Sequence, residues 1–224
     1  MTDTIDAISR SLSADVRAVN TLSHNVANIN TPGFRAGRVV PDFGTSLAPR
    51  VALDLVDGAL SPTGQPLDLA LRGRGFFAVE RDGATLLTRA GDFRLDAGGH
   101  LVNSRGDRVL GEAGPIQLAD TDALRIHADG SLHANGQAVG QLKIVEVAEP
   151  TRLVAAPGGG YGYDGALAAW QGTVVQGALE RANVDAAEQT VQLMELTRHA
   201  ESVQRAISIY DKAMDVGINR LGDN

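Results

Sequence analysis

Apolar residues recur at steps of three and four at both ends of the chain, and this spacing constrains the fold most. Near the N-terminus they fall at Ile5, Ile8, Leu12, Val16, Val19, Leu22, Val26 and Ile29. The mean step is close to that of a coiled-coil seam. Asn30-Thr31-Pro32-Gly33 then opposes helix continuation. The spacing therefore predicts a helix over residues 4–28.

A second stripe predicts a longer helix at the C-terminus, with Asn183 as its N-cap. Its apolar positions are Leu193, Leu196, Ala200, Val203, Ile207, Tyr210, Met214, Ile218 and Leu221. Each stripe is narrow and needs a partner to bury it. We therefore expect the N- and C-terminal helices to pair as a coiled coil. The C-terminal stripe is longer than the N-terminal one, so part of it would stay exposed in a monomer. This exposure favours burial against other subunits.

The middle of the chain, from about residue 50 to 165, reads instead as short strands. Phe76–Glu80 and Thr85–Thr88 flank Asp82-Gly83, which is a hairpin signature. Further strands are expected at residues 93–95, 101–103, 108–110, 124–127, 131–134 and 141–147. The predicted fold class is α+β, with a central all-β domain of short antiparallel strands between the terminal helices.

A weak internal repeat lies inside this region. Residues 94–101 (RLDAGGHL) resemble residues 125–132 (RIHADGSL). Two copies are too few for a solenoid. The repeat predicts two hairpins of similar construction.

Composition excludes several classes of protein. The 224 residues carry a net charge of −7 and no cysteine, which disfavours nucleic-acid binding and rules out disulfides, thiolate nucleophiles and cysteine-based zinc sites. No apolar run approaches the length of a membrane span. Residues 1–6 (MTDTID) are acidic, unlike the start of a signal peptide. A cytosolic location and export without a cleaved signal both remain open.

Chemical motifs are weak. His127, Asp129 and His133 could suggest a metal site, but no third metal ligand is evident and turn residues are the simpler interpretation. The glycine-rich segments 72–75 and 158–162 lack the context of a phosphate-binding loop. We expect no catalytic, cofactor-binding or metal-binding residues, and hence no enzyme.

Three blocks resemble the flagellar basal-body rod and hook protein family, in family order. In the first, residues 20–35, the family's helix-end signature is matched by Asn25, Ala27, Asn28, Thr31, Gly33 and Phe34. The second block joins residues 66–79 to 88–93 and resembles the start of the family's β-domain. The third, residues 176–185, resembles the segment before the family's C-terminal helix.

The resemblance implies a structural subunit of the flagellar rod, which polymerises through its terminal helices into a helical drive shaft. Residues 109–116 and 139–143 favour the proximal-rod type. A distal-rod or other rod/hook-junction subunit is the alternative. A soluble coiled-coil adaptor or a β-sandwich hydrolase is a remote one. Implied partners are copies of itself, other rod proteins and the flagellar type III export apparatus, without nucleic acid or membrane insertion. The implied location is the periplasmic rod of the basal body, reached without a cleaved signal peptide.

The resemblance also divides the chain and suggests its contact residues. Residues 1–35 and 171–224 would supply the helices of the tube-forming domain, residues 36–65 an extended linker, and residues 66–170 the central β domain. Amide side chains can bridge neighbouring backbones in a packed polymer. The expected subunit interface comprises Leu12, Val19, Leu22, Asn25, Ala27, Asn28, Asn30, Thr31, Gly33, Phe34, Leu193, Leu196, Val203, Ile207, Tyr210, Met214 and Leu221.

Overall fold

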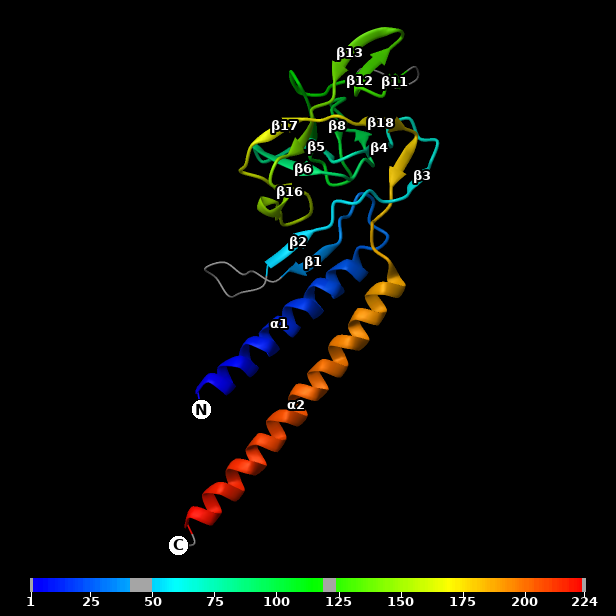
Figure 1. Cartoon of the computed structure of the whole chain (residues 1–224). Helices are drawn as coiled ribbons and strands as arrows, with labels where there is room; N and C mark the ends of the chain where they lie inside the picture. The colour runs from blue at the N-terminus through cyan, green and yellow to red at the C-terminus, as the bar shows by residue number, and fades with distance from the viewer. Residues whose placement is uncertain (1, 41–49, 119–123, 223–224) are drawn as a thin grey trace. The chain divides into compact units, whose positions relative to one another are not determined.

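A computed structural model describes residues 2–40, 50–118 and 124–222 (Figure 1). The chain divides into two compact units. The first, which we call the helical unit, comprises Met1–Ala27, Gly37–Val51 and Asp185–Asn224. The second, which we call the β unit, comprises Asn28–Ala36 and Ala52–Val184.

Two long helices form most of the helical unit. α1 spans Thr2–Ala27 and α2 spans Ala186–Gly222, so they are about 39 Å and 55 Å long. The short strands β1 (Gly37–Val40) and β2 (Arg50–Leu53) pair with each other. α1 ends before Pro32 and Gly33, as the sequence predicts.

The predicted N-cap of α2 is wrong. Asp185, not Asn183, accepts hydrogen bonds through Oδ1 from the backbone N–H groups of Ala187 (2.8 Å) and Glu188 (3.2 Å). These N–H groups have no partner inside the first helical turn, so a carboxylate there stabilises the helix start. Asn183 is bonded to other segments.

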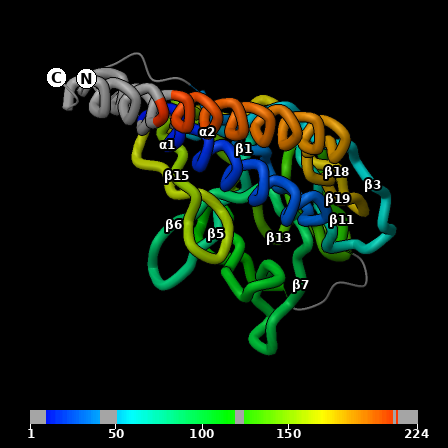
Figure 2. The backbone as a smooth tube through the Cα atoms, turned by 90° about the horizontal axis from the view of Figure 1, so that it is seen from below, coloured from blue at the N-terminus to red at the C-terminus, as the bar shows by residue number. Residues whose placement is uncertain are grey.

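α1 and α2 run antiparallel and side by side (Figures 1 and 2). Asn25 Nδ2 donates to Gln189 Oε1 at 3.0 Å, and His199 Nδ1 lies 2.9 Å from Asp15 Oδ2. Both pairs have residue numbers that add to 214, which places Thr2 level with about Lys212. The last ten residues of α2, 213–222, therefore extend past the described part of α1.

The coiled-coil pairing predicted from the two stripes is wrong, although the α+β class is consistent with the structure. α1 meets α2 through Asp15 and Asn25, which are polar. Val16 and Val19, in the predicted seam, are exposed. Leu22 is the buried apolar residue of α1 in the described part of the chain. Polar bonds thus connect the two helices, and four of the five stripe residues of α1 whose side chains the structure describes stay exposed.

The β unit is built from short antiparallel strands in four sheets. Its elements are β3 (Leu60–Pro62), β4 (Leu69–Arg72), β5 (Gly75–Arg81), β6 (Ala84–Thr88), β7 (Arg94–Leu95), β8 (Leu101–Val102), β9 (Arg108–Gly111), β10 (Gly114–Pro115), β11 (Leu124–Ile126), β12 (Ser131–Ala134), β13 (Gln137–Gln141), β14 (Ile144–Val147), the 3-10 helix η1 (Pro150–Arg152), β15 (Val154–Ala155), β16 (Tyr161–Gly162), β17 (Leu167–Ala169), β18 (Thr173–Gln176) and β19 (Ala178–Glu180).

The main sheet has the strand order β15-β16-β6-β5-β9-β8-β7, with β10 beside β9 and β14 bridging β5 and β17. β11, β12 and β13 form a three-stranded sheet. β18 pairs with β4 and β19 pairs with β3. These last two pairs bring the segment before α2 back onto the first strands of the unit.

The hairpin predicted at Asp82-Gly83 is confirmed. β5 and β6 pair antiparallel up to Arg81 opposite Ala84. Asp82 and Gly83 have φ values of 51° and 78°. Two successive positive φ values are typical of the tight turn that suits strand twist, and they explain the Asp-Gly sequence.

The internal repeat also corresponds to two similar hairpins, as predicted. In β7–β8 the Asp96 N–H donates to the His100 carbonyl at 2.9 Å, and in β11–β12 the His127 N–H donates to the Ser131 carbonyl at 2.9 Å. Asp96 and His127 are equivalent in the two copies. The same spacing of residues therefore builds the same turn twice.

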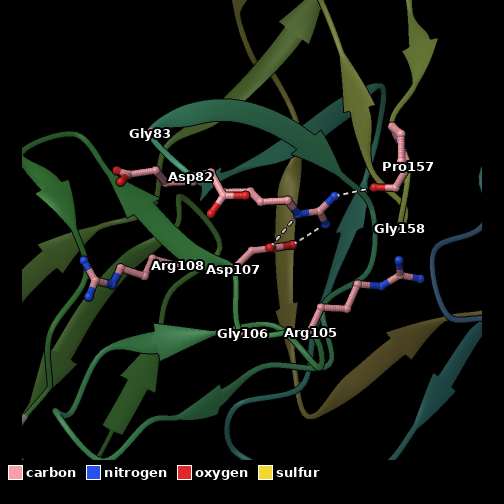
Figure 3. A pocket seen from close by; sticks show the side chains of 10 residues that line it. Asp82, Gly83, Arg105, Gly106, Asp107, Arg108, Pro157 and Gly158 are labelled. Carbon is pink, nitrogen blue, oxygen red and sulfur yellow. Dashed lines mark hydrogen bonds and ion pairs between the residues drawn. The ribbon is translucent and has the colours of Figure 1, made fainter.

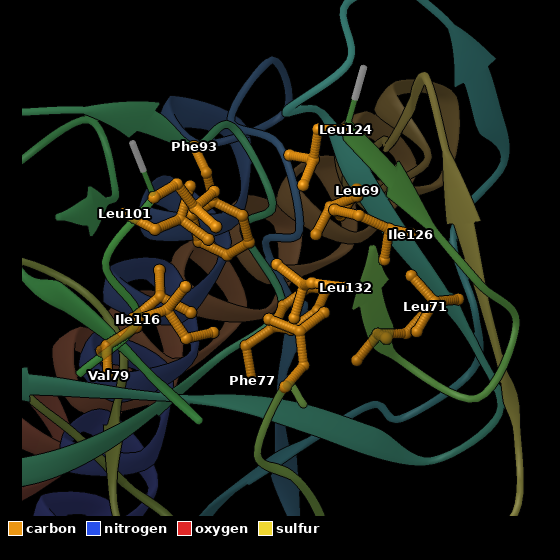
Figure 4. Packing of buried hydrophobic residues seen from close by; sticks show 14 residues of the cluster. Leu69, Leu71, Phe77, Val79, Phe93, Leu101, Ile116, Leu124, Ile126 and Leu132 are labelled. Atoms are coloured by element: carbon orange, nitrogen blue, oxygen red, sulfur yellow. The ribbon is translucent and has the colours of Figure 1, made fainter. Parts of the chain in front are cut away.

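The core of the β unit lies on both faces of β5. Figure 4 shows the cluster on the face of Phe77. Phe77 and Phe93 meet edge to face with ring centroids 5.1 Å apart, among Leu101 and Leu132. Phe76, on the opposite face, packs in a second cluster. Alternate residues of a strand point to opposite faces. β5 is therefore a continuous apolar run because both its faces are buried.

Among the described residues, neither helix has a stretch apolar enough and long enough to span a bilayer.

Candidate assembly surfaces and the buried charge cluster

Four apolar side chains form an exposed face on α1. We call Leu12, Val16, Val19 and Val26 the α1 stripe; their exposed fractions lie between 38% and 53%. At 3.6 residues per turn they fall within about 80° of helix circumference. The side that meets α2 is about a quarter of a turn away. The α1 stripe is therefore a separate apolar surface that α2 leaves open.

α2 has exposed apolar side chains as well. Val191, Leu193, Met194 and Ile209 are between 45% and 69% exposed. Three other residues of the predicted interface, Leu196, Val203 and Ile207, are half-buried. The side chains of Tyr210, Met214 and Leu221 lie outside the described part of the structure.

Asn25, in the middle of the predicted interface, is buried within the helical unit. Its side chain is 2% exposed. Oδ1 accepts from the Gly37 N–H at 2.8 Å, and Nδ2 donates to the Gly37 carbonyl at 2.9 Å and to Gln189 at 3.0 Å. Gln189 was not among the residues predicted from the sequence. The sequence feature that could have identified it is a glutamine one turn into α2, on the side that faces α1.

Residues 28–35 of the helix-end block, which spans residues 20–35, belong to the β unit. The Thr31 N–H donates to the Asn28 carbonyl at 2.9 Å, which closes a turn after α1. Phe34 is half-buried, while Asn30 is exposed and lines a small pocket of about 190 Å³. Of the other predicted interface residues, Ala27 is exposed.

Gly33 is required by its surroundings. Its φ is +65°, and a Cβ there would lie 2.2 Å from the backbone carbon of Arg89. Its N–H donates to the Glu180 carbonyl at 2.7 Å. Only glycine combines a left-handed backbone with so close an approach. The Thr-Pro-Gly-Phe sequence therefore docks the chain after α1 onto β19 and the end of β6.

Four charged side chains, Arg35, Asp57, Arg89 and Glu180, form a buried charge cluster in the β unit. Arg89 Nε lies 2.8 Å from Glu180 Oε2, and Arg35 Nη2 lies 2.9 Å from Glu180 Oε1. Asp57 Oδ1 accepts from both guanidinium groups at 3.0 and 3.2 Å. Arg35, Arg89 and Glu180 are at most 2% exposed, whereas Asp57 is 39% exposed. Two positive and two negative groups compensate one another.

Backbone groups complete the cluster. Arg89 also donates to the carbonyls of Gly73 and Gly75, both at 2.6 Å. The Gly58 N–H donates to Glu180 at 2.7 Å. Burial, followed by the charge of Arg89, lowers the pKa of the Arg35 guanidinium. A guanidinium nevertheless stays charged in proteins, so the carboxylates are needed.

No member of this cluster was predicted from the sequence to have a role. Arg35, Arg89 and Glu180 all lie within the family-like blocks, but the blocks do not indicate which residues pair. One sequence feature could have pointed to the cluster, namely a charged residue directly after an apolar strand: Arg89 follows β6. Partners 91 positions apart, as for Arg89 and Glu180, cannot be paired from spacing.

The glycine-rich segment at residues 72–75 makes room for an aromatic side chain. A Cβ on Gly75 would lie 2.5 Å from Trp170, and one on Gly172 would lie 2.4 Å from it. Gly73 also lies next to the indole. The glycines therefore have a packing role, and their carbonyls bind Arg89.

A polar pocket of about 690 Å³ lies at the β5–β6 hairpin (Figure 3). Arg81 binds both oxygens of Asp107, at 2.7 and 2.6 Å, and the carbonyl of Pro157 at 2.6 Å. The Arg81 hydrogen bond holds the pKa of Asp107 below its usual range. A carboxylate held ionised in this way is poorly suited to proton transfer near neutral pH.

The two histidines of the weak metal motif pack on each other. The rings of His127 and His133 meet edge to face at 4.6 Å, and Asp129 accepts from the Ser131 hydroxyl at 2.7 Å. In the described ranges no three His, Cys, Asp or Glu residues are grouped to hold a metal ion.

Comparisons with known proteins cover nearly the whole chain. Three family descriptions match in order: "Flagella basal body rod protein" at residues 6–35, "Flagellar hook protein FlgE/F/G D1 domain" at 70–134, and "Flagellar basal body rod FlgEFG protein C-terminal" at 175–221. The flagellar basal-body rod protein FlgF of Rhizobium meliloti is 32% identical over 96% of each chain. The chain belongs to the flagellar basal-body rod protein family.

Further relatives agree. FlgF of Escherichia coli is 32% identical over 84% of this chain and 85% of its own. The rod protein FlgG of Bacillus subtilis is 28% identical over 90% and 92%. The family predicted from the three sequence blocks is confirmed. The FlgF relatives also support a FlgF-like rod protein.

Proposed function

We propose that this chain is a structural subunit of the flagellar basal-body rod, of the FlgF type. The observation that carries the proposal is the match to a FlgF protein over 96% of both chains. Family membership also implies a place in the basal body and assembly with other rod or hook proteins. Further contacts with copies of itself are part of the proposal.

The exposed faces of the terminal helices are the proposed assembly surfaces. Fully burying one valine or leucine side chain is worth about 1.5–3 kcal/mol, so the α1 stripe and the open side of α2 would stabilise a polymer. Contacts between unlike surfaces that do not close into a ring generate a helical filament. The terminal segments 1–35 and 171–224 would then form the tube, and residues 66–170 an outer body.

The helix-end block takes two roles in this proposal. Asn25 and Gly33 are engaged inside their own chain, so they shape the subunit. Leu12, Val19 and the exposed Asn30 are available to neighbours. In this proposal the exposed residues contact neighbouring subunits, and Asn25 and Gly33 keep the block in the shape that those contacts need.

The proposal also includes the export route of the chain and a non-catalytic role. The membership of the rod protein family supports passage through the flagellar type III apparatus into the periplasmic rod. A non-catalytic role is supported by the polar pocket at the β5–β6 hairpin, where Arg81 pairs with the carboxylate of Asp107.

Substitution in the α1 stripe tests the assembly role. Val16→Asp places a charge on the exposed apolar face, whereas Ser13→Asp adds the same charge at an exposed position outside the stripe. Both proteins should keep the circular dichroism spectrum of the parent. Only Val16→Asp should be missing from purified basal bodies and leave cells non-motile. Normal incorporation of Val16→Asp would rule out the stripe as an assembly surface.

A FlgG-type distal-rod subunit is the second candidate, because the Bacillus subtilis FlgG relative also matches over 90% of this chain. Antibody labelling of isolated basal bodies separates the two. Labelling in the part of the rod nearest the cytoplasmic membrane supports the FlgF type, and labelling next to the hook supports the FlgG type.

A further inference from the structure

A small pocket lies inside the β unit, where the helix-end block meets the paired strands β3 and β19. Its volume is about 190 Å³, and its apolar walls are Ile29, Pro32, Leu179 and Ala182. Ser61 is directly opposite Leu179 in the strand pair, so both side chains lie on one face. Pockets for drug-sized ligands start at about 300 Å³. This pocket, which we call the β3–β19 pocket, is therefore sized for a single side chain.

Backbone hydrogen bonds hold the walls of the β3–β19 pocket in place. The Gly33 N–H donates to the Glu180 carbonyl at 2.7 Å, which fixes the helix-end block against β19. The Arg181 N–H donates to the Ala59 carbonyl at 2.9 Å, which fixes the backbone at the rim. The pocket is therefore already formed in the single chain.

Three polar side chains that line the β3–β19 pocket have no partner. Asn30, Ser61 and Arg181 make no side-chain hydrogen bond or ion pair with any described residue. Asn30 and Arg181 are exposed, and Ser61 is half-buried. A guanidinium offers N–H donors in a fork that matches a carboxylate. The pocket thus fits an apolar side chain that lies next to a carboxylate.

α2 carries such a pair of side chains. Val191 is 55% exposed, and Glu195 lies one turn further along the same face of the helix. Glu195 is exposed and has no hydrogen bond or ion pair with another described residue. Glu188, on the other side of Val191, is already bound by Gln192 at 3.0 Å. Glu195 is therefore the carboxylate that remains available beside an exposed apolar side chain.

The other exposed apolar residues of the described parts of α1 and α2 do not meet this requirement. Asp15 is at helical spacing from Leu12 and Val19, but it is bound by His199. The remaining ones have no acidic residue three or four positions away; they are Val16, Val26, Leu193, Met194 and Ile209. Charge complementarity therefore selects Val191 and Glu195 as the match for the pocket.

We propose that Val191 and Glu195 of one copy of this chain dock on the β3–β19 pocket of a second copy. Val191 enters the apolar interior, and the Glu195 carboxylate accepts from the Arg181 guanidinium. The two surfaces are unlike, so each copy can both give and receive the contact. Repeated contacts of this kind extend a helical polymer when they do not close into a ring. The inference deepens the proposed function and rests on it.

Exchange of the two charges tests the contact. Arg181→Glu and Glu195→Arg each bring like charges together, so each should lower incorporation into purified basal bodies at least about tenfold. The variant with both changes restores opposite charges between copies and should recover to within about twofold of the parent. Both positions are exposed, so all three variants should keep the circular dichroism spectrum and melting temperature of the parent.

Arg125→Glu is the matched control, because Arg125 is an exposed arginine on β11 that does not line the pocket. This variant should be incorporated like the parent. Normal incorporation of the two single variants would overturn the inference, as would a double variant that is no better than they are. A loss with Arg125→Glu equal to that with Arg181→Glu would also overturn it, because net charge would then explain the effect.

Disulfide formation shows which copies touch. The chain lacks cysteine, so Ser61→Cys together with Val191→Cys adds one thiol at the pocket and one on α2. Oxidation of basal bodies should then join two copies, seen as a dimer on a non-reducing gel. Ser61→Cys with Leu193→Cys should give no dimer, because Leu193 lies about 200° around the helix from Val191.

The outcomes separate the inference from the proposed function. A disulfide within one chain, or no disulfide with Val191→Cys, would overturn the contact between copies. Incorporation of the parent with neither a charge effect nor a cross-link would contradict only this inference. Absence of the unmodified parent from basal bodies would instead contradict the proposed function itself.

Discussion

Arg89 and Glu180 form an ion pair of 2.8 Å between side chains that are 1% and 0% exposed, although they are 91 positions apart. The pair connects the end of β6 to β19, the last strand before α2. It forms only when the C-terminal part of the β unit has returned to the first strands. The pair therefore links completion of the β unit to the point where α2 begins.

Replacing Glu180 by glutamine should strongly destabilise the β unit. The variant leaves two buried guanidinium groups with only the half-exposed Asp57 as a negative partner. Removing one member of a buried ion pair costs about 3–5 kcal/mol. Urea unfolding followed by tryptophan fluorescence measures the loss, because Trp170 packs beside Gly75, whose carbonyl binds Arg89.

Arg152→Met provides the control for that experiment. Arg152 pairs with Asp164 at 3.0 Å, but both side chains are largely exposed. Exposed ion pairs contribute little because water and salt screen them. The unfolding midpoint should stay at the parent value, and equal losses in the two variants would contradict a special role of burial.

Gly33→Ala should destabilise the chain much more than Gly64→Ala. Both glycines have positive φ, but a Cβ on Gly33 meets the backbone of Arg89 at 2.2 Å, while one on Gly64 meets nothing within 4 Å. The backbone strain alone costs about 1–2 kcal/mol. Thermal unfolding of the two variants should therefore differ clearly, and equal melting temperatures would show that the segment after α1 can shift away from Arg89.

Asp107→Asn should lower stability at neutral pH but not at strongly acidic pH. The pKa of Asp107 is depressed in the folded state by the Arg81 hydrogen bond. Its contribution is thus fully present above the unfolded value of about 3.9 and is lost as pH falls through the lower folded value. Unfolding free energies of parent and variant should converge below about pH 4. A constant difference at all pH values would exclude this linkage.

Asp185→Ala should shorten or weaken the start of α2. The carboxylate satisfies the N–H groups of Ala187 and Glu188. Loss of an N-cap of this kind costs about 0.5–2 kcal/mol. Amide exchange at residues 187 and 188 should speed up, while exchange in β5 stays unchanged. Equal protection in parent and variant would mean that the cap contributes nothing.

Local chemistry explains the parts of the fold that the sequence predicted well. The Asp-Gly turn of β5 and β6, the repeated hairpins and the end of α1 at Pro32 each depend on residues close together in the chain. Apolar spacing likewise identified both helices. The family-like blocks gave the protein family, because they combine such local features in a fixed order.

Errors arose where two distant segments had to be matched. The apolar stripes suggested a coiled coil, yet α1 meets α2 through the Asn25–Gln189 and Asp15–His199 pairs, and Leu12, Val16, Val19 and Val26 stay exposed. Asn183 looked like a helix cap because it precedes an apolar stripe, but Asp185 is closer to the true start. Polar side chains have several possible partners, and spacing does not choose among them.

The sequence by itself determined the helices, the hairpins and the family, because periodicity, turn chemistry and short motifs act over a few residues. Only the tertiary structure decided that Arg35, Arg89 and Glu180 share one buried cluster, and that Ala36 and Gly37 are held by two different asparagines. The physical reason is desolvation. A buried charge or amide must find its partner within about 3 Å, and which distant segment supplies that partner is set by the packing of the whole unit.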